Sequence, residues 1–271
     1  MTSLFLPSIR VAAFLALTLP MMPVQASLLA MKSPWARYLP ARYHRLCCRI
    51  FGIHRACHGV RSTHRPTLFV SNHVSYFDIT ILGATLEGSF VSKAEVGRWP
   101  LVGWLARLQR TVFVERADRI GAARQRDEIS TRLDHGDNLI LFPEGTSSDG
   151  IHILPFKTSL FAAADDSRVM VQPVSLVYQR LDGIPLGRFY RPFFAWYGDM
   201  TMWPHVWVAL GMGQLMVAIV FHEPVRLADF GSRKALSEHC RRVIGEGVAA
   251  ALGGNLAAST PLAVSPALAA Q

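Results

Sequence analysis

A closely spaced histidine and aspartate are the residues in this sequence best suited to catalysis. His73 and Asp78 lie in the segment Asn-His-Val-Ser-Tyr-Phe-Asp. A carboxylate bonded to one imidazole nitrogen fixes the tautomer and leaves the other nitrogen free as a base, an effect worth about 10²–10⁴ in rate. Such a base can deprotonate a hydroxyl group for attack on an acyl carbon, so the pair indicates acyl transfer. The alternative interpretation makes Asp78 no more than a helix cap.

A second group of polar residues follows an apolar run further along the chain. The segment Phe-Pro-Glu-Gly-Thr, at residues 142–146, comes after the apolar residues 138–142 and is rich in backbone donors and hydroxyl groups. Turns at strand ends are where open α/β sheets bind ligands. Between the two groups, Arg116 ends a run typical of a strand, where a guanidinium can bind phosphate or carboxylate. A surface ion pair is the alternative for this arginine.

Alternating strand and helix patterns surround these residues. Ser75 is suited to cap a helix that starts at residue 76, which places Asp78 in the first turn beside the histidine. The alternation predicts an α/β fold with a mixed, largely parallel sheet covered by helices. Glycines split the apolar stretch 203–221, so we expect it to be soluble and not a second span. We expect strands at 67–71, 88–92, 111–114, 138–142, 171–177 and 215–221, and helices at 76–86, 100–109, 119–135, 157–164 and 233–250.

In this order, the motifs resemble those of the glycerophospholipid acyltransferase family, which includes bacterial 1-acyl-glycerol-3-phosphate acyltransferases. The resemblance covers about residues 65–225, and the histidine–aspartate and Phe-Pro-Glu-Gly-Thr motifs match in full. Two positions depart from the family pattern: Arg110 stands where glycine is usual, and Ser147 stands where many members carry Arg or Lys. Residues 191–199, Arg-Pro-Phe-Phe-Ala-Trp-Tyr-Gly-Asp, also resemble lyso-ornithine lipid acyltransferases.

The resemblance implies a mechanism without a covalent enzyme intermediate and a role for each matching residue. His73 would take the proton from the hydroxyl of a lysolipid, and Asp78 would orient the imidazole. The acceptor implied first is 1-acyl-sn-glycerol-3-phosphate, with lyso-ornithine lipid as the alternative. The acyl donor would be a thioester of acyl carrier protein or coenzyme A, with no other cofactor. Residues implied to bind the acceptor are Arg116 and Lys93 at the head group, and Glu144, Gly145 and Thr146 at the glycerol or its equivalent.

The positive charge of this chain lies at its N-terminus. No Asp or Glu precedes Asp78, and the remaining basic and acidic residues cancel, so the first 77 residues hold the formal net charge of +9. A basic arm of this kind fits nucleic acid or an anionic membrane. Its apolar and aromatic neighbours favour an anionic membrane surface, so we expect no nucleic-acid partner. The basic residues are Arg10, Lys32, Arg37, Arg42, Arg45, Arg49, Arg55, Arg61 and Arg65.

Residues 1–32 predict a hydrophobic membrane anchor. The uncharged stretch from Val11 to Met31 is about long enough to span a bilayer, although Pro20 and Pro23 can make it re-entrant or hairpin-like. A cleaved signal peptide is the alternative interpretation. The basic residues that follow favour retention at the cytoplasmic face of the inner membrane. We therefore expect, after the anchor, a basic amphipathic interfacial segment (33–64), an acyltransferase α/β domain (65–250) and a disordered tail (251–271).

Other functional classes find little support in the sequence. The four cysteines show no paired spacing for zinc, and we expect no metal. A serine hydrolase would need a nucleophilic elbow, but no Gly-x-Ser-x-Gly segment occurs. A nonenzymatic binder would explain the basic arm and leave His73, Arg116 and Glu144 without a role.

Overall fold

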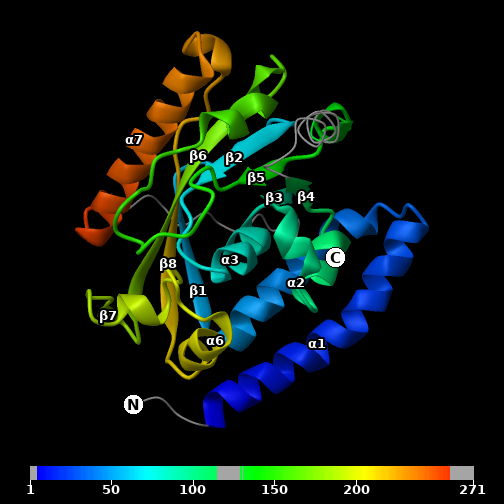
Figure 1. Ribbon diagram of the computed structural model, residues 1–271, viewed down its shortest axis with the longest axis vertical. Helices are drawn as coiled ribbons and strands as arrows, with labels where there is room; N and C mark the ends of the chain where they lie inside the picture. Colours follow the sequence, from blue (N-terminus) through cyan, green and yellow to red (C-terminus); the bar gives the residue numbers. More distant parts are fainter. Residues whose placement is uncertain (1–4, 115–128, 130, 257–271) are drawn as a thin grey trace.

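A mixed sheet forms the centre of the molecule (Figure 1). The computed structural model describes residues 5–114, 129 and 131–256. Within these residues the eight-stranded sheet has the order β1-β8-β6-β2-β5-β3-β4, with β7 paired to β6. Pairing is parallel except between β6 and its neighbours β7 and β8. The strands are β1 (Ile53–His58), β2 (Thr67–Ser71), β3 (Ser89–Lys93), β4 (Val112–Val114), β5 (Leu139–Leu141), β6 (Met170–Leu181), β7 (Ile184–Pro185) and β8 (Leu215–Phe221).

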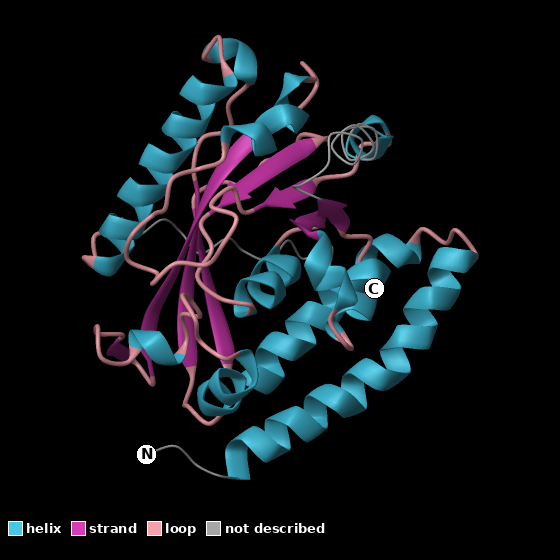
Figure 2. Cartoon of the chain, in the orientation of Figure 1, coloured by secondary structure: helices cyan, strands magenta, loops and turns pink. Residues whose placement is uncertain are grey.

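Helices cover both faces of the sheet (Figure 2) because its central strands are apolar on both sides. In β2, Phe69 packs in one core with α2, α3 and α6, whereas Leu68 and Val70 pack in the other with α7 and the 3₁₀ helix η2. This burial on both faces is typical of a parallel strand in an α/β protein. The helices are α2 (Trp35–Phe51), α3 (Phe77–Thr85), η1 (Ala94–Arg98), α4 (Val102–Leu108), η2 (Thr158–Asp165), η3 (Arg191–Phe193), α6 (Met202–Leu210), η4 (Leu227–Asp229) and α7 (Arg233–Leu252).

The long helix α1 (Phe5–Ala30) lies along the outside of the helical layer and forms a hairpin with α2 (Figure 1). Of the helices in the described ranges, it is the one long and apolar enough to cross a membrane. Polar side chains on its inward face bond to the rest of the chain. Arg10 donates to the carbonyl of Leu210 (2.9 Å), and Gln25 donates to the carbonyl of Leu108 (3.0 Å). Directed hydrogen bonds therefore join α1 to the domain.

The expected fold class is confirmed, and the differences from the expected elements are local. Residues 53–58, which we placed in the interfacial segment, form the edge strand β1, so the sheet begins before residue 65. The expected helix at 157–164 is a 3₁₀ helix. The expected helix at 119–135 and the tail at 251–271 lie largely outside the described residues. The stretch 203–221 contains α6 followed by the core strand β8, as its glycines indicated.

Candidate active site

The predicted histidine–aspartate pair forms directly after β2. The His73 Nδ1 lies 2.7 Å from the Asp78 Oδ2, and the Asp78 side chain is fully buried. The same carboxylate accepts the backbone amides of Val74 (2.6 Å) and Ser75 (3.0 Å), and its other oxygen accepts the hydroxyl of Tyr178 (2.7 Å). A carboxylate that accepts this many hydrogen bonds is fixed in place. It can therefore orient the imidazole and stabilise its protonated form.

The second ring nitrogen of the histidine is available for chemistry. Because Nδ1 faces the carboxylate of Asp78, it carries the proton, and Nε2 of His73 is left with its lone pair. The ring stacks on that of Phe142, with centroids 4.2 Å apart, and its side chain is 20% exposed. Such an imidazole is held in one orientation and remains partly exposed. This arrangement is that of a general base.

The expected cap of α3 is formed in part. The helix starts at Phe77, after Tyr76, and no side chain makes a cap hydrogen bond there. The expectation that the Ser75 hydroxyl caps this helix is therefore wrong. Its backbone amide instead donates to Asp78, the half of a capping box in which a first-turn carboxylate reaches back. Asp78 thus closes the helix start and orients the histidine at the same time, so the two interpretations of this residue are compatible.

Glu144 holds the histidine loop from the opposite side. Its Oε1 accepts the backbone amide of His73 (2.8 Å), and its Oε2 accepts that of Leu154 (2.9 Å). The residue is only 3% exposed. Burial raises the pKa of Glu144 to about 7, against the opposing effect of the two amides. Both carboxylate oxygens of Glu144 therefore bind backbone amides and hold the histidine loop in place. This arrangement does not support the acceptor-binding role that the sequence led us to expect for Glu144.

The other expected site residues lie at the same edge of the sheet where the structure describes them. β2, β5 and β3 are parallel neighbours, so residues after their carboxyl ends emerge together. Gly145 has φ of +70°, a conformation that favours glycine, and Thr146 beside it is exposed. Lys93 ends β3 and is partly buried. Arg116 lies outside the described residues, so its expected role stays a prediction.

The segment at 191–196 connects two loops of the site: the histidine loop after β2, which contains Val74, and the loop after β5, which contains Ser147. The Trp196 amide donates to the carbonyl of Val74 (2.9 Å), next to the histidine, and the Trp196 carbonyl accepts the hydroxyl of Ser147. Arg191, buried to 5% exposure, donates to the carbonyls of Tyr178 (3.2 Å) and two other residues. Ser147 is itself buried, at 7% exposure. The sequence did not identify Trp196 or Tyr178 as part of the site. Trp196 does lie in the motif at 191–199, which resembles lyso-ornithine lipid acyltransferases.

An apolar cavity lies near the histidine loop, since Tyr76 and Phe77 are among its lining residues. It has a volume of about 490 Å³ and lies between α1, α2, α3, α4, α6 and β3. Phe90 lines it and stacks on Phe142, the ring that also contacts His73. Its walls also include His44, whose pKa burial lowers to about 4, so that this imidazole is neutral. The volume is in the range of sites that enclose a small apolar ligand.

A histidine base and an apolar cavity near it define the class of this protein. The base can activate a hydroxyl group, and the cavity can hold a hydrocarbon chain. Together they describe an enzyme that transfers an acyl chain to an alcohol.

Comparisons with known proteins agree with this class. The model of the Acyltransferase family matches residues 54–177. A lyso-ornithine lipid O-acyltransferase of Brucella abortus (strain 2308) is 44% identical, over 84% of this chain and 88% of its own length. A 1-acyl-sn-glycerol-3-phosphate acyltransferase of Neisseria gonorrhoeae is 32% identical, over 63% of this chain and 65% of its own length. The crystal structure of the 1-acyl-sn-glycerophosphate (LPA) acyltransferase PlsC from Thermotoga maritima matches with a TM-score of 0.66 and 23% identity, over 91% of this chain and 94% of that one.

This chain belongs to the Acyltransferase family and is an O-acyltransferase. The match to the Thermotoga maritima structure confirms the mixed α/β fold with its flanking helices.

Proposed function

We propose that this chain transfers a fatty acyl group from an acyl thioester to the hydroxyl group of lyso-ornithine lipid. The observation that carries the reaction is the His73 imidazole, oriented by Asp78 and close in sequence to Tyr76 and Phe77, which line the apolar cavity. The observation that favours this acceptor is the 44% identity to a lyso-ornithine lipid O-acyltransferase over most of both chains. The sequence motifs put lysophosphatidate first, and the extent of this similarity reverses the order.

The reaction follows from the geometry of the base. Nε2 of His73 takes the proton of the acceptor hydroxyl, and the resulting oxygen attacks the thioester carbonyl. Asp78 stabilises the imidazolium that forms. The tetrahedral intermediate then collapses, the carbon–sulfur bond breaks, and the thiolate takes the proton back from the imidazolium. One ester bond forms, one thioester bond breaks, and the histidine returns to its starting state without a covalent enzyme intermediate.

The acyl chain of the thioester is proposed to occupy the apolar cavity. Burying a methylene group stabilises binding by about 0.8 kcal/mol, so a cavity that encloses most of a chain supplies several kcal/mol. Tyr76 fixes one wall, because its hydroxyl donates to Nδ1 of His205 (2.8 Å). The other nitrogen of His205 lies 3.0 Å from the carbonyl of Pro192 and therefore carries the proton. The choice between acyl carrier protein and coenzyme A as donor stays open.

Residue 147 is the position where the two acceptors make different demands. A phosphomonoester would gain from a cation there, as many family members have, but Ser147 is buried and bonded to the carbonyl of Trp196. An arginine at this position would have to displace the segment that contains Trp196. Ser147→Arg should therefore lower transfer to both acceptors. A gain with lysophosphatidate would favour that lipid as the natural acceptor, our second candidate.

Lys93, Gly145, Thr146 and Arg116 are proposed to contact the acceptor head group. Lys93 and Thr146 supply a cation and an exposed hydroxyl at the catalytic edge, which suits a carboxylate-bearing head group. Glu144 is proposed to act on the histidine loop and not on the acceptor, because its oxygens bind backbone amides.

The protein is proposed to act at the cytoplasmic face of the inner membrane with α1 lying in the interface. α1 continues through Pro20 and Pro23, and its inward face bonds to the domain through Arg10 and Gln25. A helix crossing the bilayer would have to break these bonds. Its outward face, in contrast, exposes large apolar side chains, which fits an interfacial helix better than a span. These are Phe5, Ile9, Leu19 and Val24.

The function is tested with the purified full-length chain in mixed micelles. It is supplied with acyl-carrier-protein or coenzyme A thioesters and with either lyso-ornithine lipid or lysophosphatidate, and the diacyl products are quantified. We expect ornithine lipid to form with the higher kcat/KM and His73→Ala to abolish both products. Release of free fatty acid without diacyl lipid would contradict the proposal.

A further inference from the structure

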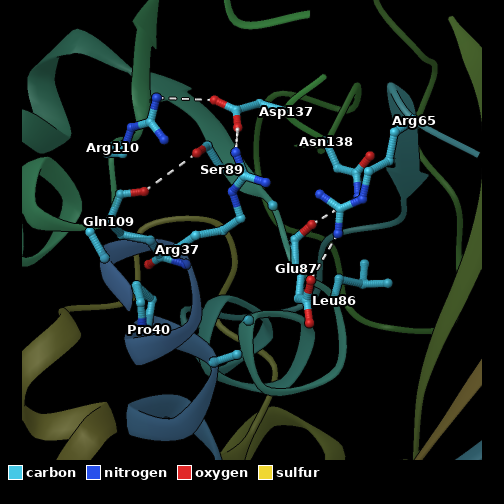
Figure 3. A pocket seen from close by; sticks show the side chains of 14 residues that line it. Arg37, Pro40, Arg65, Leu86, Glu87, Ser89, Gln109, Arg110, Asp137 and Asn138 are labelled. Carbon is cyan, nitrogen blue, oxygen red and sulfur yellow. Dashed lines mark hydrogen bonds and ion pairs between the residues drawn. The ribbon is translucent and has the colours of Figure 1, made fainter. Parts of the chain in front are cut away.

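An arginine-lined cleft lies at the edge of the sheet opposite the catalytic histidine. It has a volume of about 40 Å³, enough for a group of a few heavy atoms, and Figure 3 shows its lining residues. Arg65 precedes β2, and Asn138 precedes β5, so the cleft lies at the amino ends of these strands. His73 follows the other end of β2, a strand about 16 Å long. The cleft is therefore separate from the reaction site.

Positive charge exceeds negative charge in this cleft. Asp137 is the common partner of three guanidinium groups: Arg132 at 2.8 Å, Arg110 at 3.0 Å and Arg37 at 3.8 Å. Arg132 is 11% exposed and already satisfies the buried carboxylate, whereas Arg110 and Arg37 are 39% and 46% exposed. Arg65 adds a further cation, which pairs with Glu87 at 2.8 Å. Among the described residues that line the cleft, three arginines thus face two carboxylates, and Arg132 contacts Asp137 from outside this lining.

The residue type at position 110 is a second observation. Arg110 follows the end of α4 with φ of +60°, the left-handed conformation in which helices commonly end and for which glycine is the usual residue. Glycine would fit there without strain, yet the chain carries an arginine whose side chain enters the cleft (Figure 3). Burial and then repulsion from Arg132 lower the pKa of Arg110. The unusual feature is therefore the charged residue type and not the backbone conformation.

The neighbouring surface indicates where the anion comes from. Arg37 lies on α2 near Trp35 and Tyr38, which are 53% and 39% exposed. Aromatic side chains of this kind lie at the depth of lipid head groups. We propose that the cleft binds the phosphate group of an anionic phospholipid of the membrane surface, held by Arg37, Arg65 and Arg110. The bound head group would fix the α1–α2 hairpin against the α/β domain, independently of the acceptor used in the reaction.

Arg110→Gly is the test variant, because glycine adopts the same φ without strain and the fold should be kept. Arg188→Gly is the matched control, since it removes the same charge from an exposed position in the loop between β7 and η3. Co-flotation is measured with vesicles of phosphatidylcholine alone and of phosphatidylcholine with phosphatidylglycerol. The shift of Tm with inorganic phosphate is measured in parallel, because a ligand of the folded state raises it.

We expect Arg110→Gly to weaken binding to the anionic vesicles by about five-fold, the effect of one basic residue near a membrane surface, and Arg188→Gly to leave it unchanged. Arg37→Gln should act like Arg110→Gly. A loss of the phosphate-induced Tm shift in Arg110→Gly, with unchanged vesicle binding, would support a phosphate site but overturn the lipid as its source. Equal losses in Arg110→Gly and Arg188→Gly would overturn the site, since the effect would then be general charge. The absence of any effect of Arg110→Gly on vesicle binding and on the phosphate-induced Tm shift would also overturn the site.

Discussion

The two ends of the parallel strands each hold a buried carboxylate, but in opposite electrostatic surroundings. At the carboxyl ends, Asp78 receives two backbone amides, one phenol and the catalytic imidazole. At the amino ends, Asp137 receives three guanidinium groups. Neutral donors hold the first carboxylate in place without cancelling its charge, whereas arginines more than cancel the second. Asp78 can therefore orient and stabilise an imidazole, whereas Asp137 holds a group of arginines together.

This comparison explains why, in the part of the chain that the structure describes, the groups bonded to Asp78 include no arginine or lysine. An arginine beside Asp78 would offset the negative charge that stabilises the imidazolium of His73, and the base would weaken. Neutral donors leave the negative charge of Asp78 able to stabilise the His73 imidazolium that forms during the reaction. At the amino ends no proton moves, so accumulated positive charge carries no such penalty and can attract an anion.

The largest effect is expected at the catalytic pair. His73→Ala removes the base, and Asp78→Asn removes the charge that stabilises the imidazolium, so each should lower kcat by about 10²–10⁴. Rates are measured with saturating acceptor, and vesicle binding serves as the control because neither residue belongs to the membrane-facing surface. Full activity of Asp78→Asn would reduce this aspartate to a helix cap.

The next effect concerns Glu144 and is a dependence of stability on pH. The pKa of Glu144 is raised from 4.5 to about 7 by burial, so between these values the folded chain binds more protons than the unfolded chain. The free energy of unfolding should therefore fall as pH rises through this window, by up to about 3 kcal/mol. Chemical denaturation of wild type and Glu144→Gln from pH 4.5 to 8 isolates this contribution. Parallel curves for the two proteins would show that the pKa of Glu144 is not raised.

Much of the fold and the core of the site could be predicted because their signals are local. The runs at 67–71 and 215–221 are apolar and bounded by polar residues or glycine, and both are strands. His73 and Asp78 are close in sequence, so a single turn brings them together. β1 was missed because Ile-His-Arg-Ala-Cys-His, at 53–58, is basic and only Ile53 is buried, as an edge strand permits.

The remaining features depend on distant contacts. Tyr178 reaches Asp78 only through the pairing of β6 with β2, and nothing in its own neighbourhood marks it. Arginines that the sequence assigned to the membrane also bond within the protein. Arg45 donates to the carbonyl of Ala84 (3.1 Å) and Arg61 to that of Thr85 (3.1 Å), where unpaired carbonyls end α3. The charge of a basic segment can be read from the sequence, but the partners of each arginine cannot.

A smaller effect is expected from the phenol that supports Asp78. Tyr178→Phe leaves the Oδ1 oxygen of a buried carboxylate without its donor, which costs about 1–3 kcal/mol. We expect a fall in kcat of about ten-fold, because the carboxylate is held less firmly while the base is intact. Tyr190→Phe, at an exposed position, is the matched control. An unchanged kcat together with a lower Tm would make Tyr178 a structural residue only.

The smallest effect is expected where the two catalytic loops are tied together. Ser147→Ala removes one hydrogen bond to the carbonyl of Trp196, a loss of about 1 kcal/mol, and keeps the packing of the buried residue. The Trp196 segment should then hold the histidine loop less firmly, and kcat/KM with lyso-ornithine lipid should fall by about five-fold. Ser167→Ala, at an exposed position, should change nothing.

The ratio of the kcat/KM values for the two acceptors shows whether the hydrogen bond between Ser147 and Trp196 affects substrate selection or only the order of the histidine loop. If the segment of Trp196 shapes the acceptor site, Ser147→Ala should lower transfer to lyso-ornithine lipid more than transfer to lysophosphatidate. If the tie only positions the loop of His73, both activities should fall equally, because both reactions use the same base. An unchanged rate with both acceptors would show that the hydrogen bond between Ser147 and Trp196 contributes nothing to catalysis, and that the histidine loop is positioned by its other contacts, those of Asp78 and Glu144.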